Sequence, residues 1–182
     1  MSQRTARTLL AVLLLGIYST LYVARTVTNF LRDAGVLRLS VGIAFTLAAL
    51  AVIALVLRNA ELRNPRTLLL MLWAGGLYGA VVFPMESPEE KLHFIEYGAV
   101  GVLAFLSMPF AWSESRRFFF AVLFTLGAGW VDEGIQALLP NRHYDLRDVG
   151  FNALAGAMAS TLFVAFRALQ RKTSAKNESI SA

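Results

Sequence analysis

The sequence predicts an all-α protein, a polytopic transmembrane helix bundle with about six membrane-spanning helices. Of its 182 residues, 57% are hydrophobic and 16% are charged, whereas soluble domains average about 45–50% apolar and about 25% charged residues. Apolar runs that can each cross about 30 Å of hydrocarbon recur along the chain, and short polar connections separate them. Both features indicate that lipid is the solvent. The chain has no cysteine, which excludes disulfides, cysteine–zinc sites, iron–sulfur clusters and thiol nucleophiles.

Each predicted span is long enough to cross the bilayer as a helix, because a helix rises about 1.5 Å per residue. The first span follows Arg4 and Arg7, as in a signal peptide, but it is longer than a signal core and no clear cleavage site follows it. We therefore expect it to remain as a helix. The six predicted spans are Thr8–Ala24, Leu39–Leu57, Thr67–Met85, Leu92–Trp112, Phe118–Leu139 and Val149–Leu169.

The connections between the spans are short, and two of them carry local signals. Within Arg25–Arg38, apolar residues at helical spacing predict a short helix that lies in the membrane interface. Pro65 is expected to start the third span. The polar tail from Arg171 is rich in Ser and Lys and is expected to be disordered.

Basic residues dominate the charge, since the net charge is +5. They are scattered in ones, twos and threes between the apolar runs, which is typical of membrane flanks and does not suggest a nucleic-acid partner. The two ends of the chain and the second and fourth connections carry most of them, which predicts that both termini are cytoplasmic. The three arginines of the first connection, Arg25, Arg32 and Arg38, go against this trend.

Small residues form two stripes in the predicted spans. Gly75 and Gly79 make a GxxxG pair in the third span, and Asn152, Gly156 and Ser160 are spaced four residues apart in the sixth. Small residues let the backbones of neighbouring helices approach closely in lipid. We therefore expect both stripes to be helix contacts.

Polar residues gather where the fourth span begins, the fifth ends and the sixth begins. Asp132 lies eight residues before Pro140, which puts it about 12 Å below the connection in a regular helix. A charge at the bilayer centre costs about 2.5–3.5 kcal/mol on insertion scales, so such residues face the protein interior or a water-filled cavity. His93, Glu96 and Tyr97 share one helix face because they are three and four residues apart.

The other two helix ends offer polar faces at the same level. Glu133 and Asp132 each share a face with Gln136, and Asp148 shares one with Asn152. We therefore expect one polar pocket that opens outward, with two loop arginines, Arg142 and Arg147, over its mouth.

Three interpretations of this pocket are open from the residues alone. The first is a structural network in which Arg142 and Arg147 pair with Asp145, Asp148 and Glu133, because buried charges need partners.

The second interpretation is a divalent metal site built from His93 with Asp132, Glu133 or Asp148. No tight ligand motif is present, and a divalent metal is the one cofactor that the sequence suggests. The third interpretation is an anion-binding or acid–base site. The two loop arginines would hold a phosphate or carboxylate, and Glu133, Glu96 or His93 would move protons.

Two motifs resemble the VanZ-like family. The first is Glu90-Lys91-Leu92-His93-Phe94-Ile95-Glu96-Tyr97-Gly98, with Glu90 where the family more often has Asp. The second motif begins with Asp132-Glu133-Gly134-Ile135-Gln136 and continues with Pro140, Arg142, Asp145, Asp148, Asn152 and Gly156. The resemblance covers about residues 73–166. It implies a four-helix VanZ-like domain in residues 67–170 that follows two additional N-terminal helices in 1–66. The polar tail inferred from composition occupies 171–182.

The resemblance implies an envelope role, because founding members of the family are associated with low-level resistance to teicoplanin, but it does not supply a reaction. It marks the same residues as the depth argument. The catalytic candidates are His93, Glu96, Asp132 and Glu133. The candidates for binding substrate are Lys91, Tyr97, Gln136, Arg142, Asp145, Arg147, Asp148 and Asn152.

The leading hypothesis is that the protein, in the inner or plasma membrane, binds and could modify an anionic envelope molecule at the outer leaflet. A lipid-linked cell-wall precursor or a phospholipid head group is the expected class of partner. The alternatives are a non-catalytic small transporter, flippase or accessory subunit, and a purely structural polar cluster that binds no ligand.

Overall fold

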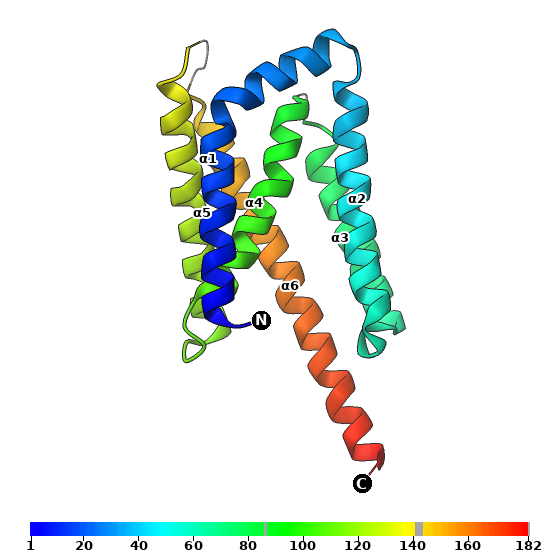
Figure 1. Cartoon of the computed structure of the whole chain (residues 1–182). Coiled ribbons are helices and arrows are strands. Elements are labelled where there is room, and N and C mark those ends of the chain that lie inside the picture. The colour runs from blue at the N-terminus through cyan, green and yellow to red at the C-terminus, as the bar shows by residue number, and fades with distance from the viewer. Residues whose placement is uncertain (86, 141–143, 182) are drawn as a thin grey trace.

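The structure is a computed structural model that describes residues 1–85, 87–140 and 144–181, apart from the side chains of residues 89 and 174–181. All regular structure in these ranges is helical, which confirms the predicted all-α class (Figure 1). In chain order the elements are α1 Gln3–Asp33, α2 Leu37–Arg58, the 3-10 turn η1 Ala60–Leu62, α3 Pro65–Val82, α4 Pro88–Ser107, α5 Glu114–Ala137 and α6 Leu146–Ser181.

Within the described residues, five helices are long and apolar enough to cross a membrane: α1, α2, α3, α5 and the part of α6 from Leu146 to Thr173. The protein is therefore membrane-embedded. The exception is α4, which corresponds to the predicted span Leu92–Trp112 but begins and ends earlier and carries His93 and Glu96 near its start. Because α4 packs against α1, α2, α5 and α6, much of its surface faces protein, and a helix surrounded by protein can keep polar residues.

Polar side chains next to the first turns define four of the helix starts. The hydroxyl oxygens of Ser2, Ser87 and Ser113 and the Oδ1 atom of Asn64 each accept a hydrogen bond from a backbone N–H three residues later. These are N-caps, which satisfy one of the free N–H groups at a helix start. Pro65 occupies the first turn of α3, so the predicted helix start at this proline is confirmed.

The first helix continues through most of the predicted connection Arg25–Arg38 and ends at Asp33. Figure 1 shows that its second part turns away from the first part and runs across one end of the bundle toward α2. The hydroxyl groups of Ser19 and Thr20 donate hydrogen bonds to the carbonyl of Gly16 at 3.2 and 2.7 Å. Such bonds to the preceding turn bend helices. The predicted interfacial helix is therefore the continuation of α1.

A tight turn at Gly35 joins α1 to α2. Gly35 has a φ of +71°, which side chains with a Cβ rarely adopt. Its N–H donates to the carbonyl of Arg32, and the N–H of Val36 donates to the carbonyl of Leu31, each at 2.9 Å. This pair of bonds is the Schellman motif that ends many helices at a glycine.

The helices α4, α5 and α6 approach one another closely at Gly101 and Gly156. A Cβ added to Gly101 would lie 2.6 Å from the carbonyl oxygen of Gly156, and a Cβ added to Gly156 would lie 2.7 Å from Cγ2 of Thr125. The stripe in α6 is therefore a helix contact, as expected. Gly75 and Gly79 differ, because a Cβ at either position would meet nothing within 4 Å, so the expected contact at this pair is absent from the described part of the chain.

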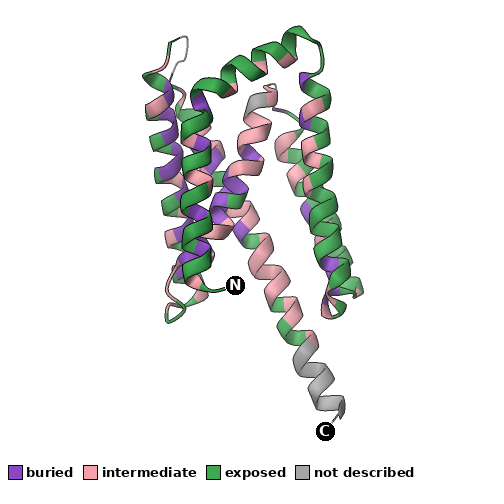
Figure 2. Ribbon diagram, viewed as in Figure 1, coloured by how far each residue is buried: buried purple, intermediate pink, exposed green. Residues whose placement is uncertain are grey.

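The first helix shares the hydrophobic core of the second half of the chain. Leu10 and Ile17 of α1 belong to the same buried cluster as Phe94, Tyr97 and Val100 of α4. Figure 2 shows buried residues along α4, α5 and α6 and on one side of α1, whereas α2 is mostly exposed. The sequence-based boundary at residue 66 therefore does not coincide with a break in packing, since α1 packs on α4.

The C-terminal residues extend α6 beyond the predicted span Val149–Leu169. The helix runs to Ser181, where the sequence predicted a disordered tail from Arg171. Residues 171–181 contain neither glycine nor proline and include Lys, Ala and Glu, which are good helix formers. Both ends of the chain lie on the same side of the bundle, opposite the turn that joins α1 to α2 (Figure 1).

Candidate functional site

The polar cluster predicted from the sequence lies inside the bundle at one end. Asp132, Glu133 and Gln136 on α5, Tyr97 on α4 and Asn152 on α6 are all buried. The start of α4, the end of α5 and the start of α6 lie at this end of the bundle (Figure 1). The polar residues that these segments carry are therefore brought together. The deep charges therefore face protein, as the depth argument predicted.

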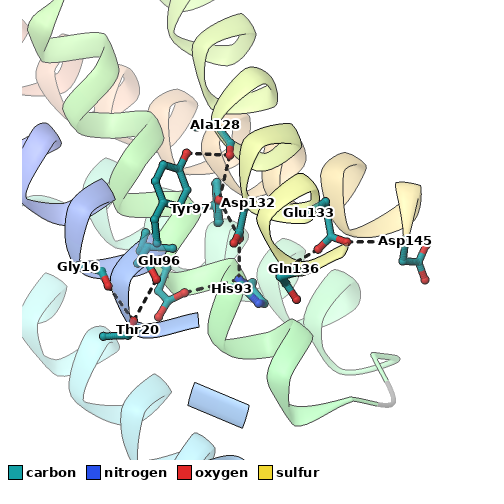
Figure 3. Close-up of polar contacts among 12 residues, drawn as sticks. Gly16, Thr20, His93, Glu96, Tyr97, Ala128, Asp132, Glu133, Gln136 and Asp145 are labelled. Atoms are coloured by element: carbon teal, nitrogen blue, oxygen red, sulfur yellow. Dashed lines mark hydrogen bonds and ion pairs between the residues drawn. The ribbon is translucent and has the colours of Figure 1, made fainter. Parts of the chain in front are cut away.

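Asp132 is the centre of one half of the cluster, and its side chain is fully buried. The hydroxyl of Tyr97 donates a hydrogen bond to its Oδ2 at 2.9 Å. Nδ1 of His93 lies 3.7 Å from the same oxygen and 3.6 Å from Oε2 of Glu96. Figure 3 shows the imidazole between these two carboxylates. His93 and Asp132 are thus close enough to exchange a proton after a small movement.

A second tyrosine joins this half from α1. The hydroxyl of Tyr18 donates to the carbonyl of Ala128 at 2.9 Å, and that of Tyr97 lies 3.3 Å from the same oxygen. The sequence analysis did not select Tyr18, because a tyrosine in an apolar span is usually packing or an interfacial anchor. Tyr18 connects α1 to this group, because it shares the carbonyl of Ala128 with Tyr97, which is bound to Asp132.

Glu133 is the centre of the other half, and it holds the start of α6. Its Oε1 accepts a hydrogen bond from Nε2 of Gln136, and its Oε2 accepts one from the backbone N–H of Asp145, each at 3.0 Å. Figure 3 shows this group beside the His93 group and separate from it. Because both carboxylate oxygens of Glu133 are engaged by the fold, its contacts are those of a structural residue.

We predict that Glu133→Ala lowers the thermal stability of the detergent-purified protein. It leaves the Asp145 N–H and the Gln136 amide without their acceptor, and an unsatisfied buried polar group costs about 1–3 kcal/mol. Thermal unfolding of the variant beside Glu114→Ala tests this. Glu114 forms an exposed ion pair with Arg171 at 3.1 Å, and such pairs contribute about 0–1 kcal/mol. Equal melting temperatures for the two variants would contradict the prediction.

Asp145 and Arg147 form the N-terminal cap of α6. Oδ1 of Asp145 accepts from the backbone N–H of Arg147 at 2.8 Å, and the Arg147 guanidinium donates to Oδ2 at 2.8 Å. These hydrogen bonds from Arg147 hold the pKa of Asp145 below its usual value. The Arg147 side chain is 75% exposed and does not line the cavity described next. The expected place of Arg147 over the pocket mouth therefore stays a prediction, and Arg142 lies outside the described residues.

A cavity of about 260 Å³ opens beside the cluster. Its lining includes His93 and Asp148, which the sequence analysis selected, and two arginines of α1, Arg25 and Arg32, which it did not. The complete lining is Arg25, Thr28, Arg32, Ser87, Glu90, His93 and Asp148. The sequence did mark these arginines, because both belong to the first connection, whose three arginines go against the positive-inside rule.

The remaining candidates lie at the edge of this arrangement or away from it. Asn152 is buried against Gly129, where a Cβ added to the glycine would lie 3.0 Å from Cβ of Asn152. Lys91 does not line the cavity and forms no hydrogen bond through its ammonium group with a described residue. No group of three or more His, Asp and Glu residues with the spacing of a metal site occurs in the described part of the chain. A metal at His93 with Asp132, Glu133 or Asp148 stays a prediction.

These features define a helical membrane protein with a buried carboxylate cluster and an adjoining charged cavity at one end of the bundle. Comparison with protein-family models, with curated proteins and with solved structures finds no match.

Proposed function

We propose that the chain is a VanZ-like membrane protein whose cavity binds the anionic group of an envelope molecule, such as a phospholipid or a lipid-linked cell-wall precursor. The observation that carries this proposal is the presence of Arg25, Arg32 and His93 in the lining of one cavity. Guanidinium groups bind phosphate through paired, charge-assisted hydrogen bonds. A pocket that holds two of them at a membrane surface suits a phosphate ester.

The proposed topology puts both termini in the cytoplasm and the cavity on the outer face of the inner or plasma membrane. It is supported by the distribution of Lys and Arg between the connections. It is also supported by the position of both chain ends opposite the turn that joins α1 to α2 (Figure 1), because the last part of α1, before this turn, supplies two residues of the cavity lining. The arginines of the first connection are the exception to this distribution. Two of them line the cavity, so a ligand-binding role accounts for basic residues on that side of the membrane.

We extend this proposal to chemical modification of the bound molecule. His93 lines the cavity and also lies beside the buried carboxylate of Asp132. A histidine held between a substrate and a carboxylate is the usual arrangement for general acid–base catalysis. A role in envelope integrity or in glycopeptide tolerance follows from the resemblance to the VanZ-like family alone.

Native mass spectrometry of the detergent-purified protein tests the binding proposal. We expect the wild type to retain a phosphate-bearing lipid and Arg25→Gln to retain about tenfold less, because a charged hydrogen bond contributes about 1.5–3 kcal/mol. Arg38→Gln is the matched control, since Arg38 is exposed and lies outside the cavity. Equal retention by all three proteins would refute the proposal.

A structural role for the polar cluster is the second candidate, and the contacts of Glu133 favour it for that half of the cluster. In this case the protein would be a non-catalytic accessory subunit, transporter or flippase. Flux of a labelled lipid across liposomes that contain the protein separates a transporter from a subunit without transport activity.

A further inference from the structure

The walls of the cavity carry opposite charges. One wall comes from the second part of α1 and presents Arg25 and Arg32. A second wall comes from the starts of α4 and α6 and presents Glu90 and Asp148. Arg25 and Asp148 do not pair with each other, and neither side chain forms an ion pair or hydrogen bond with another described residue. The cavity is therefore bipolar. Its lining contains a cation, Arg25, and an anion, Asp148, whose side chains form no hydrogen bond or ion pair within the part of the chain that the structure describes.

A bipolar cavity selects against ligands of a single charge. A ligand with only a phosphate would gain the arginines but would face the carboxylates of Glu90 and Asp148, and like charges brought together at a binding site oppose binding. A purely cationic ligand would meet the opposite problem at Arg25 and Arg32. A ligand that carries both charges matches both walls.

We propose that the ligand is a phosphate ester that also carries a primary ammonium group, as in a phosphoethanolamine head group, with its phosphate on the α1 wall and its ammonium group at Asp148 and Glu90. This inference rests on the proposed function and narrows its class of ligand. The ammonium group offers three N–H donors to the carboxylates, which an N-acylated or glycerol head group does not.

The position of Asp148 supports this assignment. It lies in the first turn of α6, and the cap formed by Asp145 fixes that turn through the N–H of Arg147. The backbone N–H of Asp148 is bound to the carbonyl of Asp145 at 3.1 Å, so the backbone is held while the carboxylate stays at the cavity. The fold thus positions an acceptor that no described residue uses.

Lipid titrations by native mass spectrometry test the proposal with three lipids of identical acyl chains. They are phosphatidylethanolamine, its N-acetylated derivative and phosphatidylglycerol. We expect the wild type to bind phosphatidylethanolamine about tenfold more tightly than the other two, because one hydrogen bond to a charged group contributes about 1.5–3 kcal/mol and about 1.4 kcal/mol is a factor of ten in affinity. Asp148→Asn should remove this preference without weakening the binding of the N-acetylated lipid. Arg25→Gln should weaken the binding of all three lipids. Asp33→Asn is the control, because Asp33 is exposed and lies outside the cavity.

The outcomes separate this inference from the proposed function. Equal affinity of the wild type for all three lipids, with Arg25→Gln still weaker, would refute the bipolar ligand and leave phosphate binding intact. Affinities that Arg25→Gln does not change would refute both. The comparison among lipids in the wild type needs no variant, so it remains decisive if Asp148→Asn does not fold. Displacement of phosphatidylethanolamine by soluble O-phosphoethanolamine would assign binding to the head group alone, and failure to displace it would assign the site to the lipid.

Discussion

Replacing Gly101 with alanine should weaken the contact between α4 and α6 and lower the thermal stability of the purified protein. The added Cβ would lie 2.6 Å from the carbonyl oxygen and 2.8 Å from the carbonyl carbon of Gly156. Both atoms belong to the backbone, so no side chain can rotate to make room, and the two helices must move apart. Overpacking of this kind typically costs about 1–3 kcal/mol.

Gly98 provides the matched control for this substitution. It lies one turn earlier on α4, and a Cβ there would lie 3.5 Å from Cβ of Ala159, which is an ordinary van der Waals contact. Gly98→Ala should therefore melt close to the wild type, while Gly101→Ala should melt several degrees lower. Similar melting temperatures for Gly101→Ala and Gly98→Ala would show that the close approach of α4 to α6 is not present in the protein.

Gly156 allows a second check by rescue. A Cβ at this position would meet the side chain of Thr125, at 2.7 Å from Cγ2 and 3.0 Å from Oγ1. Truncating that side chain makes room, so Thr125→Ala should restore much of the stability that Gly156→Ala loses, and a double-mutant cycle measures this coupling. Thr125→Ala should not rescue Gly101→Ala, because the obstacle there is backbone.

The sequence predicted the helical fold because hydrophobic segments of membrane length give a strong signal. It did not predict the place of α4, which has too many polar residues at its start for a lipid-facing helix and lies among four other helices. The spacing of small residues also predicted helix contacts both at the pair Gly75 and Gly79 and at the stripe that contains Gly156. Only the stripe is a helix contact in the described residues. Which small residue meets a neighbour depends on helix rotation, and spacing alone does not fix rotation.

The buried half of the site could be predicted. The unusual charge of the first connection marked its arginines, but their place in the wall of the cavity could not be predicted. Asp132 and Glu133 were found because charges deep in an apolar segment need an explanation. Arg25, Arg32 and Tyr18 lie on a helix that is distant in sequence from α4 to α6 and carries no part of either motif. Their contribution depends on the packing of α1 against α4 and on the turn of α1 across the end of the bundle, which are tertiary features.

Asp132→Asn should reduce lipid retention while leaving the fold largely intact. The amide keeps the size of the carboxyl group, and its oxygen can still accept the hydrogen bond from the Tyr97 hydroxyl. The carboxylate charge beside His93 is lost, and Glu96, whose Oε2 lies 3.6 Å from Nδ1, is the carboxylate that remains beside the imidazole. Because His93 lines the cavity and loses the carboxylate that lies 3.7 Å from its Nδ1, its imidazole is held less firmly, and we expect weaker retention of a phosphate-bearing lipid.

Tyr97→Phe should have the opposite effect, and the pair of variants therefore separates ligand binding from structure. Removing the hydroxyl takes the hydrogen-bond donor from a fully buried carboxylate, which should cost about 1–3 kcal/mol of stability. It leaves His93 and the cavity lining unchanged, so lipid retention should stay close to the wild type. Melting temperature and lipid retention, measured on the same preparations, should thus change independently in the two variants. If Asp132→Asn instead lowered the melting temperature and kept the lipid, Asp132 would be a structural residue and the case for chemistry at His93 would fail.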